Sequence, residues 1–467
     1  MVFSSISFIY YFLPVVLVLY FLVPFKFKNI VLLISSLFFY IYGEPLYFIL
    51  MALSILSGYL HGFWIERAKS GRYAKIPLIS SIITSIGLLV IFKYADFFIG
   101  NINWIFKSNI PLLRIALPIG ISFYTFQILS YTIDVYRGNA EVQRNFINFA
   151  MYVSLFPQLI AGPIVRYTTV EKEINKRSHS LDNFAYGVSR FIIGLSKKVL
   201  LANNLGELVS VLQNTREKTI LSFWIAAIAF ALQIYFDFSG YSDMAIGLGR
   251  MFGFHFLENF NYPFISKSLT EFWRRWHMSL GTWFRDYVYI PMGGNRVSAI
   301  KWIRNIIVVW FLTGFWHGAQ WNFIVWGLYF AVMLAAEKYF IKKILSKLPS
   351  IAAHIYTLFF ILLSFALFNS DGMGDSLNSL AGMFGLLDVP FSNDFTLYYL
   401  KSYGFTMLIA AAGSTPLIKT LFMKISNMDT LRKAVNIMEP VMLVLLLLLI
   451  TGYLVDGSFN PFLYFRF

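Results

Sequence analysis

One ionisable side chain stands in the apolar stretch FLTGFWHGAQWNFIVWG, which runs from Phe311 to Gly327. It belongs to His317, and a neutral imidazole can take a proton from an attacking hydroxyl near pH 7. Near it in the chain, Trp316 and Trp321 are candidate walls of a substrate site, and Asn322 is a candidate amide donor. Gly314 and Gly318 are expected to leave room for a substrate beside the ring. The structural alternative is a buried histidine that hydrogen-bonds between helices. The stretch therefore indicates either a catalytic base or a structural bond within a membrane.

A second histidine, His277, lies in SKSLTEFWRRWHMSLGTWFRDYVYIPMGGNR, from Ser266 to Arg296. The spacing predicts a helix over 270–281, in which Glu271 pairs with Arg275 at i,i+4. An interfacial amphipathic helix without chemistry explains the arginine and tryptophan content of this segment. It does not explain the histidine, so His277 is a second candidate for the site.

Four basic residues are candidates to hold the phosphates of a donor: Arg274, Arg275, Lys197 and Lys198. Arginine and lysine side chains both bind phosphate oxygens. The alternative for the two lysines is that they extend along the membrane surface, with the ammonium in water.

Asp237 and Asp243 lie in the apolar segment LQIYFDFSGYSDMAIGLGR. Burying a carboxylate costs several kcal/mol unless it is paired. For both residues we favour Asp–Arg and Asp–hydroxyl bonds that lock the helices together over direct catalysis.

These candidates must be positioned by membrane helices. Of the 467 residues, 58% are hydrophobic and 19% aromatic, the mean hydropathy is +0.66, and apolar runs of spanning length recur along the chain. This composition predicts a polytopic membrane protein and excludes a soluble enzyme. Roughly a dozen spans can be drawn, near 6–24, 29–42, 47–65, 76–92, 117–133, 149–164, 188–201, 220–235, 302–316, 321–336, 351–367, 404–417 and 439–455. Several are too short for a perpendicular crossing, and Pro157, Gly162 and Pro163 predict a broken or re-entrant segment within 154–167.

The charges predict an orientation in the membrane. Basic residues cluster at 26–28, 67–75, 338–347 and 424–433, which marks these segments as cytoplasmic. The segment 368–400 carries four aspartates and no lysine or arginine, as expected for an external loop. Both termini are then expected outside, and His317 lies beyond the midplane toward the outside. The net charge of +15 is explained by cytoplasmic loops rather than by a nucleic-acid partner.

The absence of cysteine restricts the chemistry of the chain. With no cysteine it forms neither a disulfide nor an acyl-cysteine intermediate. Any acyl transfer must therefore use oxygen or nitrogen. The six histidines are scattered and no H-E-x-x-H motif occurs, so no metal site is predicted.

The motifs LTEFWRRWHMSLGTWFRDYVYIPMGGNR and TGFWHGAQWNFIVWG closely resemble the membrane-bound O-acyltransferase family, in its branch of bacterial polysaccharide O-acetyltransferases of the alginate type. LPIGISFYTFQILSYTIDVYRG, FPQLIAGPIVRY and FDFSGYSDMAIGLGRMFGF extend the resemblance, so that core motifs cover 117–327. It implies one membrane-embedded domain over 1–467, a ring of roughly 11 to 13 transmembrane and re-entrant helices around a central tunnel. It further implies that His317 is the catalytic histidine and that His277 is a second important one.

The resemblance also implies a reaction. An acetyl thioester, expected to be acetyl-CoA, arrives from the cytoplasm as a substrate, with no bound cofactor. The acetyl group passes across the bacterial inner membrane to an external polysaccharide, with a periplasmic acetyltransferase partner. His317 acts as base, and His277 orients the donor or stabilises the oxyanion.

The chain ends NPFLYFRF within the tail 456–467, and this ending is similar to the carboxy-terminal F-x-Y-x-x-F motif of the D-alanylation system. The resemblance implies that Tyr464 relays the acyl group as an ester. The alternative is an aromatic tail lying on the membrane surface.

Two other functions remain open at this point. A D-alanyl transferase of the same family would use a similar site. A transporter of an anionic polymer or lipid would use Asp237, Asp243 and His317 as binding or relay groups.

Overall fold

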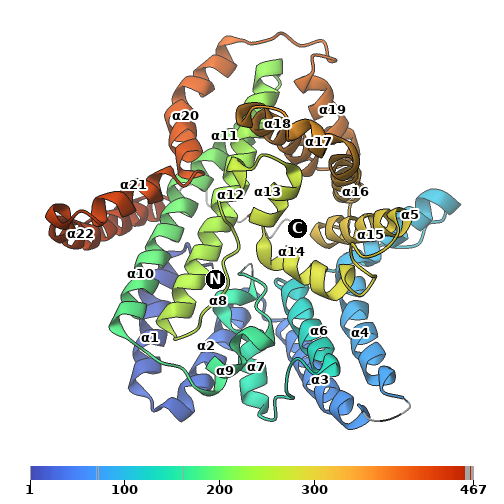
Figure 1. Cartoon of the computed structure of the whole chain (residues 1–467), viewed down its shortest axis with the longest axis vertical. Coiled ribbons are helices and arrows are strands. Elements are labelled where there is room, and N and C mark those ends of the chain that lie inside the picture. Colours follow the sequence, from blue (N-terminus) through green and yellow to red (C-terminus); the bar gives the residue numbers. More distant parts are fainter. Residues whose placement is uncertain (1, 70, 72, 161, 458–462, 464–467) are drawn as a thin grey trace. The chain divides into compact units, whose positions relative to one another are not determined.

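The computed structural model describes residues 2–69, 71, 73–160, 162–457 and 463. Every regular element within these residues is helical (Figure 1). Eight of the described helices are long and apolar enough to cross a membrane, or nine if a bent pair at 394–426 counts as one span. The prediction of an all-helical polytopic membrane protein is confirmed, and the ring with its central tunnel stays a prediction.

The chain forms two compact units, the first made of Met1–Phe191 with Met244–Leu257 and the second of Ile192–Asp243 with Glu258–Phe467. Helices α10 and α12 pass from one unit into the other. The first unit contains η1 (Ser7–Phe12), α1 (Leu13–Leu22), α2 (Phe25–Gly43), α3 (Phe48–Ala68), α4 (Lys75–Leu89), η2 (Val90–Tyr94), α5 (Ala95–Phe106), α6 (Ile121–Arg137), α7 (Phe146–Ser154), α8 (Phe156–Leu159), α9 (Tyr167–Asn175) and most of α10 (Leu181–Ser196).

The second unit holds the remaining elements. They are η3 (Lys197–Ala202), α11 (Asn203–Asn214), most of α12 (Ile220–Met251), η4 (Pro263–Ile265), α13 (Leu269–Arg275), α14 (Met278–Phe284), η5 (Arg285–Tyr289), α15 (Ala299–His317), α16 (Trp321–Ala336), η6 (Glu337–Ile341), α17 (Lys342–Leu345), α18 (Ser350–Phe368), α19 (Met373–Met383), α20 (Asp394–Gly413), α21 (Leu417–Ser426) and α22 (Asp429–Val455).

In the first unit, the segment predicted to be broken is broken. Helix α7 ends at Ser154, Leu155 leaves the helical conformation with ψ of 111°, and α8 begins at Phe156 with Pro157 in its first turn. Proline lacks an N–H and is accepted in the first turn of a helix, where that group has no partner in the helix. The break leaves the Phe156 N–H without a partner in the helix. This N–H instead donates to the Ser36 hydroxyl at 3.1 Å.

In the second unit, two glycines bring α15 and α16 into close contact. A Cβ at Gly314 would overlap the carbonyl oxygen of Phe323, and one at Gly327 would overlap the carbonyl oxygen of Trp310. Backbones approach this closely only where side chains are absent. This contact fixes the end of α15, where His317 is the last helical residue.

Candidate functional site

His317 lies in an aromatic chamber at the end of α15. Its ring is 5.2 Å from Trp326 and 5.3 Å from Phe368, both edge to face, and its residue is 8% exposed. A cavity of about 20 Å³ opens beside the imidazole, and its walls include Phe238 and Trp276. That volume holds about one water molecule. The chamber therefore isolates the imidazole from bulk solvent.

His277 lies where the expected helix over 270–281 is interrupted. Helix α13 ends at Arg275, α14 begins at Met278, and His277 adopts a left-handed conformation with φ of 45°. The prediction of one continuous helix is wrong. A non-glycine residue in this region is strained by roughly 1–3 kcal/mol, which surrounding structure must compensate.

Backbone hydrogen bonds from an earlier segment compensate that strain. The Asn259 carbonyl accepts from the Met278 amide at 2.9 Å, and the Asn261 amide donates to the Arg275 carbonyl at 2.9 Å. These bonds satisfy backbone groups that a continuous helix would have used internally. The segment around Asn259 therefore interrupts the helix and turns His277 into the interior.

The Asn259 side chain determines the tautomer of His277. Its Oδ1 accepts from the backbone N–H of Ser279 at 3.2 Å, which fixes the orientation of the amide because a backbone N–H only donates. The same oxygen lies 3.0 Å from His277 Nδ1. Because Oδ1 only accepts, Nδ1 carries the hydrogen. His277 Nε2 is left as a lone-pair acceptor, with no hydrogen-bond partner in the described part of the chain.

His277 is held neutral by its surroundings. The residue is 2% exposed, and its ring lies edge to face with Phe238 at 4.6 Å. Burial, together with the electrostatic effect of His317, holds the pKa of His277 well below its ordinary value. A neutral imidazole with hydrogen on Nδ1 cannot donate from Nε2 to an oxyanion, so the expected oxyanion role does not fit this tautomer.

Some of the residues expected beside His317 lie there in the structure, and others do not. Trp316 is buried and its ring lies 5.0 Å from the imidazole, whereas Trp321 is 54% exposed and Trp326 forms the wall in its place. Asn322 donates its amide to the Ser370 carbonyl at 2.9 Å, so that donor is already used within the protein. The room expected beside Gly318 is filled by the ring of Phe323.

The two arginines beside His277 differ. Arg275 pairs with Glu271 at 2.8 Å, as the i,i+4 spacing predicted, and also donates to the Asn261 carbonyl at 3.1 Å. Arg274 is exposed. Of the two side chains, Arg274 is therefore the better suited to bind an anion from solvent.

Lys197 and Lys198 both pair with carboxylates on α12. Lys198 Nζ lies 2.7 Å from Asp237 Oδ1, with both side chains 3% exposed, and Lys197 Nζ lies 2.6 Å from Asp243 Oδ2. The pairs agree with the locking role favoured for Asp237 and Asp243, but in both pairs the partner is a lysine where an arginine or a hydroxyl was expected. The phosphate role expected for the lysines stays a prediction.

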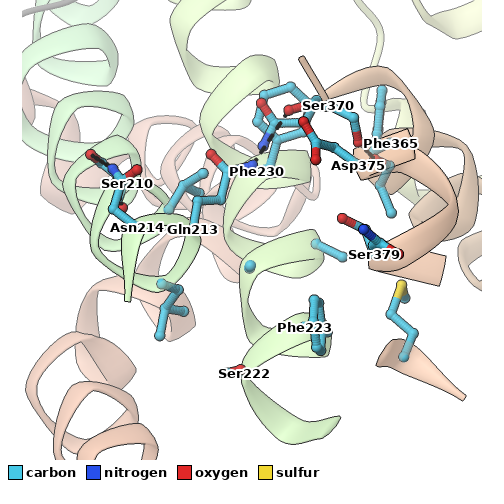
Figure 2. A pocket seen from close by; sticks show the side chains of 18 of the residues that line it. Ser210, Gln213, Asn214, Ser222, Phe223, Phe230, Phe365, Ser370, Asp375 and Ser379 are labelled. Carbon is cyan, nitrogen blue, oxygen red and sulfur yellow. Dashed lines mark hydrogen bonds between the residues drawn. The ribbon is translucent and has the colours of Figure 1, made fainter. Parts of the chain in front are cut away.

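Residues that the sequence did not indicate as a site surround a much larger cavity, of about 1000 Å³ (Figure 2). It lies between α11, the first half of α12, and the α18–α19 region. Phe365 lines both this cavity and the small one beside His317. The only prior signal was the acidic external loop, since single serines and amides on separate helices form no motif.

Leu463, a described residue of the carboxy-terminal tail, lines the same cavity. Its backbone N–H donates to Asp237 Oδ2 at 3.0 Å, on the carboxylate that pairs with Lys198. Tyr464, the expected relay residue, lies outside the described residues.

The chain is similar to proteins of known classes. Residues 140–348 match the model of MBOAT, the membrane-bound O-acyltransferase family. A probable alginate O-acetylase of Azotobacter vinelandii is 40% identical over 84% of this chain and 80% of its own length. A peptidoglycan O-acetyltransferase of Helicobacter pylori is 36% identical over 83% and 80%. A teichoic acid D-alanyltransferase of Bacillus subtilis is 30% identical over 68% and 82%.

The described residues thus form an all-helical membrane protein in which two histidines are buried beside the ring of Trp316. The chain belongs to the membrane-bound O-acyltransferase family, as its motifs predicted. It is therefore an O-acyltransferase, and the transporter alternative is set aside.

Proposed function

We propose that this chain transfers an acetyl group from a thioester donor, acetyl-CoA, to a polysaccharide outside the bacterial inner membrane. Its similarity to the alginate and peptidoglycan acetyltransferases supports acetyl transfer and a polysaccharide acceptor. The charge pattern supports a cytoplasmic donor, an external acceptor and external termini. A periplasmic partner that completes the transfer is part of the same proposal.

In the first step, the Tyr464 hydroxyl attacks the thioester carbonyl. A C–O bond forms and the C–S bond breaks, while His317 takes the hydroxyl proton and passes it to the departing thiolate. Acetyl-tyrosine and free thiol result. Leu463 supports this role for the tail, because it already lines the cavity that adjoins the His317 chamber through Phe365.

In the second step, an acceptor hydroxyl attacks the acetyl-tyrosine. His317 takes the acceptor proton and returns it to the tyrosine oxygen, so the enzyme is restored. Without the relay, His317 activates the acceptor hydroxyl directly for attack on the thioester. The two routes share one base and differ in whether the protein is labelled.

His277 supports the base in either route. Its Nε2 lone pair is free to accept a hydrogen bond from a substrate, and its neutrality leaves His317 as the histidine that takes up the proton. Arg274 would attract the donor phosphates, with Arg275, Lys197 and Lys198 as a weaker contribution because each is paired with a carboxylate.

The observation that carries the proposal is the burial of His317 and His277 against shared aromatic rings of the second unit. The ring of Trp316 lies 5.0 Å from His317 and 6.1 Å from His277, and Phe238 lines the cavity beside His317 and packs 4.6 Å from the His277 ring. The test incubates purified protein with radiolabelled acetyl-CoA and locates the label by peptide mass spectrometry. Label on Tyr464 that is lost in both Tyr464→Phe and His317→Ala supports the relay. Glycan acetylation that needs His317 without protein labelling supports direct transfer.

Loss of dependence on His317 in both assays would overturn the proposal. The product mass also separates acetyl from alanyl transfer. That comparison matters because the D-alanyltransferase of Bacillus subtilis is similar to this chain.

A further inference from the structure

The first unit buries two cations close together, Lys28 and Arg177. Lys28 lies in the first turn of α2 and is 9% exposed, and Arg177 follows α9 and is 7% exposed. Helices α2 and α9 lie side by side (Figure 1), and the Asn29 amide donates to the Ile174 carbonyl at 3.0 Å. The ring of Tyr20 joins the two cations, with Lys28 Nζ 4.3 Å and Arg177 Cζ 5.8 Å from its centroid. We call Tyr20, Lys28 and Arg177 the cationic cluster.

Arg177 donates only to neutral acceptors. Its Nε donates to the Tyr20 hydroxyl at 3.1 Å. Its Nη1 donates to Asn29 Oδ1 at 2.8 Å and to the Glu173 main-chain carbonyl at 3.1 Å. Its Nη2 is buried and has no hydrogen-bond partner in the described part of the chain. A buried guanidinium N–H without an acceptor is costly, so it points to an acceptor supplied by a ligand.

The neighbouring carboxylate of Glu173 is taken by another residue. Its Oε1 lies 2.6 Å from His255 Nδ1, and its Oε2 accepts from the His255 backbone N–H at 3.0 Å. Glu173 therefore offsets the Arg177 charge only in part. Within the described residues, neither Lys28 nor Arg177 forms an ion pair with a carboxylate. Two buried cations beside one ring repel each other unless an anion joins them.

The hydroxyl of Tyr20 does not supply that anion. It donates to the Phe252 carbonyl at 2.7 Å, which uses its only hydrogen. Its oxygen therefore accepts from Arg177 Nε and from His179 Nε2, which lies 2.9 Å away. Partial burial and the charges of Lys28 and Arg177 lower the pKa of His179. The surroundings of the cationic cluster thus disfavour a third cation and favour an anion.

The surface beside the cationic cluster is apolar and exposed. The ring of Phe21 lies 4.9 Å from Lys28 Nζ and is 45% exposed. The ring of Phe25 lies 5.5 Å from Arg177 Cζ and is 40% exposed. Phe25 begins α2, one of the helices long and apolar enough to cross a membrane. An anion with an apolar tail can therefore place its charge at the cluster and its tail along these rings.

We propose that the cationic cluster binds the phosphate group of an anionic phospholipid, with Arg177 Nη2 and Lys28 Nζ as donors. Phosphate oxygens accept from guanidinium and ammonium groups, and basic sites at the ends of membrane helices suit anionic headgroups. A soluble phosphate presents the same chemistry, and the exposed rings of Phe21 and Phe25 favour the lipid as its source. The proposal is independent of the proposed function, since neither cation is assigned to acetyl transfer.

The test measures binding of two short-chain lipids, dioctanoyl phosphatidylglycerol and dioctanoyl phosphatidylcholine, to the purified full chain in neutral detergent. Native mass spectrometry counts the bound lipid. We expect a Kd for phosphatidylglycerol that is at least about tenfold lower, and Lys28→Gln should raise it about tenfold. Lys26→Gln is the matched control, an exposed lysine of the same helix, and should change that Kd by less than about twofold.

Thermal unfolding separates loss of the lipid from loss of the fold. Without lipid, Lys28→Gln should unfold within about 2 °C of the wild type, because the lost contact with the Tyr20 ring is offset by less repulsion from Arg177. Phosphatidylglycerol should raise the unfolding temperature of the wild type but not of Lys28→Gln. Lys28→Arg keeps the charge and should retain both lipid binding and this rise.

Four results would overturn the proposal. The first two are equal Kd values for the two lipids and equal effects of Lys28→Gln and Lys26→Gln. The third is inorganic phosphate that displaces phosphatidylglycerol at equal concentration, which would make a soluble phosphate the ligand. The fourth is acetyl-CoA that displaces the lipid, which would assign the cluster to the donor instead.

Discussion

The imidazole Nδ1 of His277 lies 3.0 Å from the side-chain oxygen of Asn259. The same asparagine accepts from the backbone amides of Met278 and Ser279, through its main-chain and side-chain oxygens. One residue therefore ends the helix ahead of His277 and determines which ring nitrogen holds the proton. We infer that Asn259 is a positioning residue of the site.

Replacing Asn259 with aspartate tests that role through pH. The variant puts a carboxylate beside Nδ1, which stabilises the imidazolium and raises the pKa of His277. The Nε2 lone pair is then lost at a higher pH, so the acidic limb of the activity profile should move up by about one to three pH units. Initial rates between pH 5 and 9 measure this. The control is Asn261→Asp, whose side chain is exposed, and equal shifts in both variants would contradict the assignment.

Removal of the base should nearly abolish transfer. We expect His317→Ala to reduce acetyl transfer by about 10²- to 10⁴-fold, the usual contribution of a general base. His354→Ala removes a half-buried histidine bonded to the Ser266 carbonyl and should retain activity within about twofold. Radiolabel transfer at equal protein concentration is the measurement. Comparable rates for the two variants would exclude His317 as the base.

For the buried Lys198–Asp237 pair, removing one partner should lower the free energy of unfolding more than removing both. Lys198→Met leaves a buried carboxylate without its ammonium and should lower the free energy of unfolding by about 3–5 kcal/mol. The double variant with Asp237→Leu should recover much of that loss. Lys197→Met, at the more exposed pair, should cost less than Lys198→Met, because water reaches the Lys197 ammonium and partly screens the charge left on Asp243. A double variant less stable than Lys198→Met would contradict this account.

The glycine contact between α15 and α16 should be intolerant of a methyl group. Gly314→Ala forces the helices apart, because its Cβ overlaps the Phe323 carbonyl, and should lower the free energy of unfolding by about 1–3 kcal/mol. Gly404→Ala in α20 is the control, since nothing lies within 4 Å of its added Cβ, and should be neutral or stabilising by up to about 1 kcal/mol. Thermal unfolding followed by tryptophan fluorescence compares the two. If Gly314→Ala is as stable as the wild type, the two helices accommodate the methyl group and the prediction is wrong.

Buried neutral His277 should make stability depend on pH. Its pKa is depressed in the folded protein, so below about pH 6.5 the unfolded chain binds a proton that the folded chain does not. The contribution is complete above that pH and is lost as the pH falls, by at most about 1.4 kcal/mol per pH unit. Unfolding at pH 7.5 and 5.5 should therefore show a larger loss for wild type than for His277→Gln. Parallel losses would indicate that His277 is protonated in the folded state.

Local sequence was enough for features that depend on near neighbours. The apolar runs fixed the membrane class because hydrocarbon excludes unpaired backbone, which requires helices. Spacing gave the Glu271–Arg275 pair, proline gave the break near Pro157, and the family motifs gave His317 and His277 as candidates.

Tertiary structure decided what depends on distant segments. No local pattern shows that Asn259 would interrupt a helix 18 residues later, or that Lys197 would pair with Asp243 across 46 residues. Trp326 rather than Trp321 lines the His317 chamber because the glycine contact fixes how α16 meets α15.

The large cavity is the clearest such case. Gln233 and Asp375 are ordinary polar residues in the sequence and share a lining only after α12 and α19 pack in one unit. Local preferences act over a few residues, whereas a binding cavity is made by chain segments that meet through long-range packing. The sequence by itself thus determined the class and indicated His317 and His277 as candidates, and the fold determined the tautomer of His277 and the large cavity.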